Sequence, residues 1–511
     1  MYEFVRTIRD IYKPKSESEQ QNEDKKTFFY PQLQTNLDFI RDSFNNSADL
    51  TIHEMKLKGI GGAVISIDNL TDKEVLGESV IKPLFSYDFS GNAKQDLDDI
   101  KNKILCTDDV KNITTFEELF KLIMSGFAVI ALDGCNIMLS IGIQGFKSRG
   151  ISEPESDVVQ RGSKEGFVEP IRTNMALLRR RMKNPKLYFE VMTLGNLSKT
   201  EICLCYLKDI ASPDIVIELK RRLRKINIDT VLAAGYIVPY LEDKKGVSLF
   251  STVGITERSD TVCGKLAEGR IAILIDGVPS ALIVPYLFVE NFQTLDDYSN
   301  KPYFATFTRR LKYAAFFIAM MLPGIFVALG TFNPEMFPTL MLNKIAGSIG
   351  ATPLSLMSET ILLQFVYEIM RESGLRMPQP LGYAVSIVGG LVIGDTAINA
   401  GLIGAPTLMV VAVAIICSYI IPNLYAPVAI LRLAFTVAGG IWGIWGIAAL
   451  FCFVFINICS KSTFGIPYTA PLSPLGKGAL RDVFIRADWK TLSDKSAKVQ
   501  NMPGSHVGGG V

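Results

Sequence analysis

One acidic side chain, Asp395, lies deep inside an apolar run of the chain at residues 382–401 (GYAVSIVGGLVIGDTAINAG). If this run is a helix, its 3.6-residue repeat places four side chains on a common face: Val388, Val392, Asp395 and Asn399. A carboxylate at the centre of a bilayer costs roughly 2.5–3.5 kcal/mol on insertion scales unless it meets water or a partner. We therefore expect this face to line an aqueous pore, with the two valines as an apolar constriction and the two polar residues as a ring.

The opposite face of the same run consists of small residues: Ser386, Gly390, Ala397 and Gly401, with Gly394 beside them. Small side chains at helical spacing allow a second helix to approach closely, so this face predicts helix packing. A structural alternative for the acidic residue also fits the sequence. In that alternative Asp395 pairs with Arg432, or it is protonated and hydrogen-bonded inside a helical bundle.

The rest of the chain carries no recognisable catalytic signature. We find no nucleotide-binding P-loop, no zinc-protease HExxH motif, no nucleophile elbow and no dinucleotide-binding glycine fingerprint. Only two histidines are present, and the eight cysteines have neither zinc-ribbon nor disulfide-framework spacing. A net charge of +2 gives no argument for nucleic-acid binding. We therefore predict a protein that is not an enzyme and that holds no cofactor or metal.

The elements that must position Asp395 lie in residues 313–460, which contain only nine charged side chains although 20% of the whole chain is charged. Such a depleted run belongs in lipid. Apolar runs of about 20 residues predict four membrane-spanning helices, at 313–332, 382–401, 405–424 and 433–458. The interval 337–373 is apolar but carries charges such as Glu359 and Glu368. It predicts a re-entrant or interfacial helical segment, or two further crossings.

Charge also orients the predicted membrane domain. The segment 306–312 (TFTRRLK) places three basic residues directly before the first apolar span. The positive-inside rule then assigns the preceding sequence to the cytoplasm. The tail after residue 460 is rich in basic residues, so we expect it on the same side.

The sequence before the apolar part predicts an α/β region of two soluble subdomains. Asp133-Gly134 and Asp276-Gly277 each separate two apolar runs, which is the pattern of a β-hairpin whose tight turn needs positive φ. The recurrence suggests two related units. The domain boundaries that we expect are a disordered tether at 1–27, subdomain 1 at 28–150, a linker with subdomain 2 at 151–310, a transmembrane domain at 311–460, and a cytoplasmic tail at 461–511.

A basic cluster, Arg179, Arg180 and Arg181, ends a predicted helix of the second subdomain. Cations there complement the helix dipole, so a solvated helix end is one interpretation. The sharper hypothesis is contact with anionic lipid headgroups or with an acidic partner.

Taken together, these stretches resemble the A subunits of the GerA-type spore germinant receptors of endospore-forming bacteria. The resemblance covers about residues 28–490, and it is carried by 165–182 (EGFVEPIRTNMALLRRRM), 269–285 (GRIAILIDGVPSALIVP), 302–329 (PYFATFTRRLKYAAFFIAMMLPGIFVAL), 378–403 (PQPLGYAVSIVGGLVIGDTAINAGLI) and 464–474 (FGIPYTAPLSP).

The resemblance implies a soluble N-terminal region of two α/β subdomains, followed by a polytopic α-helical domain in the spore inner membrane. It implies that the chain acts with a transporter-like B subunit, which senses the nutrient, and a lipoprotein C subunit. It also implies oligomerisation into a ligand-gated cation channel. A paralogous group that amplifies the germination signal shares these stretches, and the sequence does not separate the two.

Three functional hypotheses follow. The favoured one is a channel-forming, signal-transducing receptor subunit whose copies surround a pore made by 382–401. The second is a secondary transporter that uses Asp395, Glu359 and Glu368 as ion sites at broken helices. The third is a non-conducting scaffold whose soluble subdomains bind partners.

Overall fold

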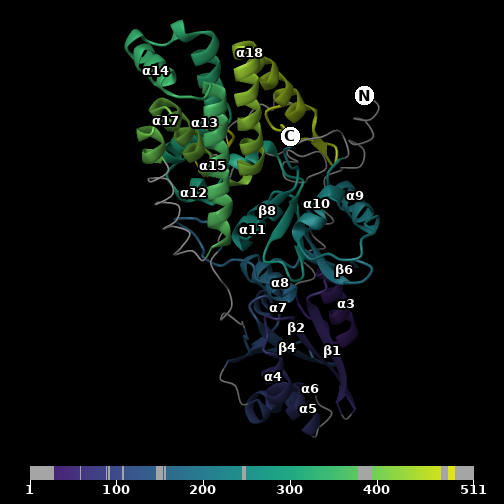
Figure 1. Ribbon diagram of the computed structural model, residues 1–511. Coiled ribbons are helices and arrows are strands. Elements are labelled where there is room, and N and C mark those ends of the chain that lie inside the picture. The colour runs from purple at the N-terminus through teal and green to yellow at the C-terminus, as the bar shows by residue number, and fades with distance from the viewer. Residues whose placement is uncertain are drawn as a thin grey trace, which may run out of the picture.

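The computed structural model describes residues 28–57, 59–87, 89, 93–105, 109–145, 154, 157–243, 249–377, 394–473 and 482–488. Figure 1 shows an elongated molecule. The first β-sheet unit lies at one end, the second lies in the middle, and the long apolar helices lie at the opposite end.

The first sheet has the strand order β1-β2-β4-β5-β3, and every neighbouring pair is antiparallel. Its strands are β1 (Leu50–Leu57), β2 (Ile60–Ile67), β3 (Val110–Ile113), β4 (Phe127–Leu132) and β5 (Met138–Gly142). On one face pack α3 (Leu33–Ser43) and α7 (Phe116–Ile123). On the other lie α4 (Lys73–Val75), η1 (Leu76–Ile81), α5 (Lys82–Ser86), α6 (Ala93–Asp99) and η2 (Ile100–Ile104). Because helices cover both faces, β4 reads as an uninterrupted apolar run.

The second sheet repeats this arrangement, with the order β6-β7-β9-β10-β8. Its strands are β6 (Leu187–Leu194), β7 (Thr200–Leu207), β8 (Gly254–Thr256), β9 (Ile271–Ile275) and β10 (Ala281–Val284). On one face pack α8 (Ile171–Arg181) and α11 (Ser259–Ala267). On the other lie α9 (Pro213–Arg224), η3 (Ala234–Tyr236) and α10 (Val238–Leu241). The short helices η4 (Phe288–Phe292) and α12 (Leu295–Ser299) lead to the helical part.

The two Asp-Gly turns play the same role in the two sheets. Each glycine has positive φ, +86° at Gly134 and +80° at Gly277, as a tight hairpin turn requires. Each aspartate also accepts a hydrogen bond from the first N–H of a helix: Asp133 Oδ1 lies 2.9 Å from the α3 donor, and Asp276 Oδ1 lies 3.0 Å from the α8 donor. The motif that recurs in the sequence therefore joins a hairpin to a helix N-terminus in both units.

The helical part begins with α13 (Pro302–Phe332), a helix of 31 residues that is about 46 Å long at 1.5 Å per residue. It continues through η5 (Pro334–Met336), α14 (Thr339–Ala351), α15 (Leu356–Arg376), a helical stretch at 394–399, α17 (Ala405–Tyr419), η6 (Pro422–Leu424) and α18 (Tyr425–Ser460). Figure 1 places α14 at the end of the bundle that is farthest from the sheets.

In the part of the chain that the structure describes, two stretches are helical, long and apolar enough to cross a membrane: Pro302–Phe332 and Pro422–Ser460. They contain the predicted spans 313–332 and 433–458. α17 has only 15 residues, so the helix within the predicted span 405–424 is shorter than expected. Most of the predicted span 382–401, namely residues 382–393, lies outside the described residues. The interval 337–373 contains α14 and most of α15, which are two separate helices.

The prediction of one straight span at 433–458 is wrong, because α18 reverses at Gly443. This glycine has φ +60° and ψ −146°, a conformation that only glycine adopts readily. Around the break, a Cβ atom on Gly446 would lie 2.5 Å from the Ala438 carbonyl oxygen, so the two limbs 425–442 and 444–460 are folded against each other. Figure 1 shows the first limb leading away from the sheets and the second returning toward them.

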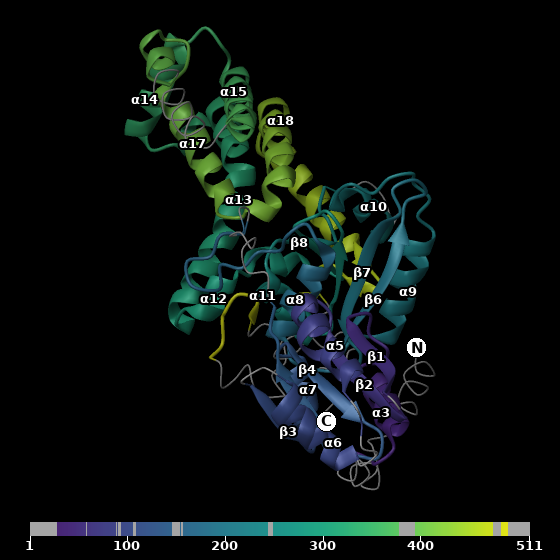
Figure 2. The same ribbon diagram turned by 90° about the horizontal axis from the view of Figure 1, so that it is seen from below.

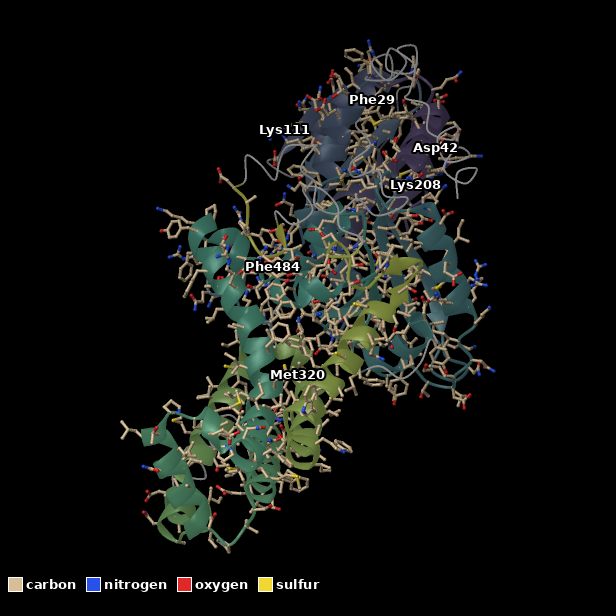
Figure 3. The ribbon with its side chains drawn as sticks, turned by 90° about the horizontal axis from the view of Figure 1, so that it is seen from above. Phe29, Asp42, Lys111, Lys208, Met320 and Phe484 are labelled. Carbon is tan, nitrogen blue, oxygen red and sulfur yellow. The ribbon has the colours of Figure 1, made fainter. Side chains whose placement is uncertain are left out.

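The base of the helical part is fastened to subdomain 2 and to the C-terminal segment. Arg309 of α13 is fully buried, and its guanidinium pairs with Asp297 at 3.2 Å and with Asp482 at 2.7 Å. Figure 3 shows Phe484 of the same C-terminal segment close to α13, where its ring centroid is 5.0 Å from that of Tyr313. The segment after residue 460 also forms the two-stranded sheet of β11 (Ser462–Thr463) and β12 (Ile466–Pro467), and Ile466 packs in the core of subdomain 2. The described tail residues are therefore part of the folded unit.

Candidate functional site in the helical domain

The run that contains Asp395 is described only in its second half. Residues 394–399 are helical, and the helix ends before Gly401, which has φ +66°. Of the predicted pore-lining and packing residues, four lie outside the described residues: Ser386, Val388, Gly390 and Val392. The role of Gly401 in this structure is to end the helix, because a positive φ costs glycine little.

The described half of this helix has two different faces. Gly394 is buried, and a Cβ atom there would lie 3.4 Å from Leu408 of α17. Ala397 packs into the apolar cluster that α15 and α17 share. Asp395 and Asn399 are both exposed. Small residues thus lie toward neighbouring helices, and the polar residues lie away from them.

Arg432 settles one alternative for Asp395. The Arg432 side chain is 1% exposed, and its Nη2 atom lies 2.9 Å from Oε1 of Glu368 on α15. The same carboxylate accepts from the Tyr425 hydroxyl at 2.8 Å and from Arg371 Nε at 2.9 Å. Because Arg432 is engaged with this other carboxylate and Asp395 is exposed, the proposed Asp395–Arg432 ion pair is wrong.

A polar stripe on α15 continues this network into the bundle. Gln364 is buried one turn before Glu368, and its Nε2 atom donates to the Thr436 hydroxyl of α18 at 2.8 Å. Among the described residues, two donors of Arg432 and Oε1 of Gln364 are buried and have no hydrogen-bond partner. Buried polar atoms of this kind are costly, so this contact between α15 and the first limb of α18 is specific rather than a general apolar contact.

Glu359 lies on a different face of the same helix, nine residues before Glu368. It is 1% exposed, and its Oε1 atom accepts a hydrogen bond of 2.6 Å from the Gly404 N–H, at the N-terminus of α17. The positive end of a helix stabilises a carboxylate, which explains how this charge is held inside an apolar bundle. The sequence drew attention to both Glu359 and Glu368, but it did not reveal their partners.

Close glycine contacts hold α13 against α18. A Cβ atom on Gly439 would lie 2.4 Å from the Gly324 carbonyl oxygen, and a Cβ atom on Gly324 would lie 2.5 Å from the Phe435 carbonyl oxygen. No side chain fits between the two backbones at this crossing. Two glycines of α18 therefore have different roles. Gly439 allows close packing against α13, and Gly443 allows the helix to reverse.

The hypothesis that Arg179 contacts lipid or a partner is wrong. This side chain is fully buried between the two subdomains, where Nε and Nη2 bond both oxygens of Asp49 at 2.7 and 2.9 Å. Its guanidinium also lies over the Phe44 and Phe189 rings, 5.4 and 4.8 Å from their centroids. Arg180 and Arg181 are partly exposed, and both pair with Glu165.

A small cavity lies between subdomain 2 and the loop that joins α17 to α18. Its volume is about 130 Å³, and its lining includes Lys265, Tyr286, Glu290 and Asn423. Glu290 is buried and accepts from Lys265 Nζ at 2.8 Å and from Arg270 Nη2 at 2.7 Å. Polar groups of subdomain 2 therefore face the loop at the start of α18 across this cavity.

Comparison with known proteins identifies the family. The family model described as Bacillus/Clostridium GerA spore germination protein matches residues 38–498. Spore germination protein KA of Bacillus subtilis (strain 168) is 36% identical over 92% of this chain and 87% of its own length. Spore germination protein GerLA of Bacillus cereus is 33% identical over 90% and 94%.

A solved structure is also similar in part. The N-terminal domain of the A subunit of the Bacillus megaterium spore germinant receptor GerK3 is 32% identical to this chain, with a TM-score of 0.39. The match covers 51% of this chain and 97% of that domain. With the match of the family model over most of its length, the chain belongs to the GerA family of spore germination proteins.

Proposed function

We propose that this protein is the membrane subunit of a nutrient germinant receptor in the spore inner membrane, and that its copies assemble into a gated cation channel. The observation that carries the proposal is the two-faced helix at 394–399. Its small residues pack on α17, while Asp395 and Asn399 are exposed. A ring of such helices would place one carboxylate from each copy in an aqueous path, where it need not pay the cost of contact with lipid.

The signal would come from partner subunits, a transporter-like B subunit and a lipoprotein C subunit. The helix α13 offers a route by which that signal could pass from the N-terminal part to the helical bundle. α13 is continuous from the buried Arg309 contacts of the soluble part to the far end of the bundle, where Phe332 lies against Gly443. A displacement of subdomain 2 would therefore move a rigid helix that contacts both limbs of α18.

The test is the ion permeability of purified protein in liposomes. We expect Val392→Ala to widen the constriction and to produce a cation leak without nutrient or partners. The matched control is Val413→Ala, which makes the same truncation at an exposed position of α17. A leak from both variants, or from neither, would count against a constriction at 392. A protein that stays monomeric in membranes would remove the channel altogether.

The transporter alternative rests on Glu359 and Glu368, and one observation favours it: Glu359 is a buried carboxylate at a helix N-terminus. Glu368, however, is paired with Arg432 and Arg371, which favours a structural role. Proton-coupled uptake that is lost in Glu359→Gln would support a transporter. Passive cation flux that is indifferent to Glu359→Gln would support the channel.

A further inference from the structure

One end of subdomain 2 exposes a set of large apolar side chains. Leu197 in the β6–β7 turn is 76% exposed, and Leu232 before η3 is 67% exposed. Tyr236 and Tyr240 follow at intervals of four residues, and Leu249 lies just after them in the chain. We call these five residues the apolar tip. In a soluble domain a group of this kind marks an interaction site.

Hydrogen bonds bring the tip together from two parts of the chain. The β6–β7 turn bonds to the loop after α9, through Leu197 N to the Asp229 carbonyl oxygen at 2.9 Å and Thr200 Oγ1 to the Val231 carbonyl oxygen at 2.9 Å. Val231, Ile237 and Leu241 are buried in the core of subdomain 2. The core therefore fixes η3 and α10, and the tip residues between these buried positions point outward.

The tip lies at the end of subdomain 2 that faces the helical part. β6 begins at the contact with subdomain 1, where Phe189 N bonds Ser47, so its other end and the turn at Leu197 point away from subdomain 1. Figure 1 shows α10 at the upper end of the sheet, and Figure 2 shows it again on the side that faces the apolar helices.

The helix α9 and the residues just after α10 also contact the chain immediately after the end of α18. Asp243, two residues after α10, accepts from the Ser462 hydroxyl at 3.3 Å, and Arg222 of α9 lies over the Phe464 ring at 4.4 Å. Since α18 ends at Ser460, these contacts lie within four residues of the end of an apolar helix. If α18 lies in a bilayer, the elements that carry the tip are next to its surface.

Exposed basic residues accompany the tip. Lys199 follows Leu197 in the same turn, and Arg224 and Lys225 end α9 just before the loop that the turn contacts. Tyrosines are typical of the headgroup level of a bilayer, and nearby cations are attracted to its anionic lipids. The combination of leucine, tyrosine and exposed cations fits a membrane surface better than it fits an apolar protein partner.

We propose that the apolar tip anchors subdomain 2 to the surface of an anionic bilayer, with its leucines and tyrosines at the boundary between headgroups and acyl chains. The anchor rests on the membrane placement in the proposed function. The anchor would hold subdomain 2 at a defined distance from the bilayer. A change in the position of subdomain 2 would then move α13, because subdomain 2 could not reorient freely relative to the membrane.

The test places single tryptophans in the full-length protein and measures their quenching by brominated lipids in liposomes that contain phosphatidylglycerol. The background replaces Trp442, Trp445 and Trp489 by Phe, and the reporter is Tyr236→Trp. We expect a clear loss of emission with bromine near the headgroup and less with bromine deep in the chain. The matched control is Phe85→Trp, an exposed aromatic position on α5 in subdomain 1. It should show no quenching.

A variant that keeps only the native Trp445 separates this proposal from the placement of the helices. Quenching of Trp445 without quenching at position 236 would overturn the anchor and leave the membrane domain intact. Absence of quenching at both positions would overturn the membrane placement itself. The tryptophan of Tyr236→Trp could instead be shielded from water without being quenched by the lipids, while residues at position 232 cross-link between copies. This result would assign the tip to a contact between copies and would also overturn the anchor.

Discussion

Glu290 is a carboxylate held almost completely away from water by its own partners. Burial alone would raise its pKa, but Arg270 and Lys265 oppose it with their charges and hydrogen bonds, and the pKa is lowered to about 2. Its folded pKa is thus below its usual value of 4.5, so its contribution to stability is complete above about pH 4.5 and is lost as the pH falls toward 2.

Replacement of this carboxylate should therefore remove a pH-dependent part of the stability. We expect Glu290→Gln to lower the free energy of unfolding near neutral pH by about 3–5 kcal/mol, because Arg270 and Lys265 lose the buried carboxylate that they share. The loss should shrink between pH 4.5 and 2. Glu268→Gln is the control, since this residue also pairs with Lys265 but is more exposed. Denaturant unfolding at several pH values measures both, and equal losses in the two variants would contradict the account.

The buried ion pair of Arg179 and Asp49 is the basis of a second prediction. Arg179→Met should destabilise the protein by about 3–5 kcal/mol, because Asp49 would be left buried without its cation. Arg172→Met on the same helix removes only an exposed pair, Arg172–Glu201 at 3.4 Å, and should cost less than about 1 kcal/mol. Thermal unfolding compares the two variants. A small loss for Arg179→Met that the further change Asp49→Asn does not alter would show that this ion pair does not hold the subdomains together.

The sequence could not assign Arg179, and the reason is physical. Three arginines at a helix end look alike in the sequence, and only the fold places Asp49 next to the first of them, 130 residues earlier in the chain. Glu359 and Glu368 were recognisable as charges in an apolar run. Their partners, Gly404 and Arg432, could not be read from the sequence, because these contacts depend on how α15 packs against α17 and α18.

At the scale of the element, local signals were sufficient for the hairpins and insufficient for α18. Asp-Gly between apolar runs specifies a turn from a few neighbouring residues, and both turns are present. In α18 the sequence GGIWGIWG is compatible with a straight helix that packs through Gly439 and Gly443. Only the fold shows that the helix reverses there, where Gly443 has φ +60° and Gly446 approaches the Ala438 carbonyl oxygen.

The helix crossing gives a test at this scale. Gly439→Ala would place a methyl group 2.4 Å from the Gly324 carbonyl oxygen, and this backbone atom cannot move without separating α13 from α18. We expect a loss of about 2 kcal/mol or more, by analogy with overpacked cores. A methyl group from Gly347→Ala in α14 meets no described atom within 4 Å, so this change should be neutral or slightly stabilising. Thermal stability in detergent would measure the difference, and a neutral Gly439→Ala would refute the close crossing.

At the scale of the whole molecule, the reversal of α18 predicts its topology. Asn423 lines the cavity at subdomain 2, and Lys461 bonds Tyr468 next to the same subdomain, so both ends of α18 should lie on one side of the membrane. Single cysteines at the exposed positions 423 and 460 in a cysteine-free background should react together with an impermeant thiol reagent. A cysteine at 445 should react only from the opposite side. Reaction of 423 and 460 from opposite sides would show that α18 crosses as one straight helix.

We propose that Asp395 faces an ion path, and the cation selectivity of the reconstituted protein is the direct test of this role. Asp395→Asn keeps the shape of the side chain and removes its charge, so we expect the preference for cations over anions to fall while the protein stays folded and oligomeric. Glu372→Gln is the control, an equal loss of charge at an exposed residue of α15. Unchanged selectivity in an Asp395→Asn channel that still conducts would contradict the account.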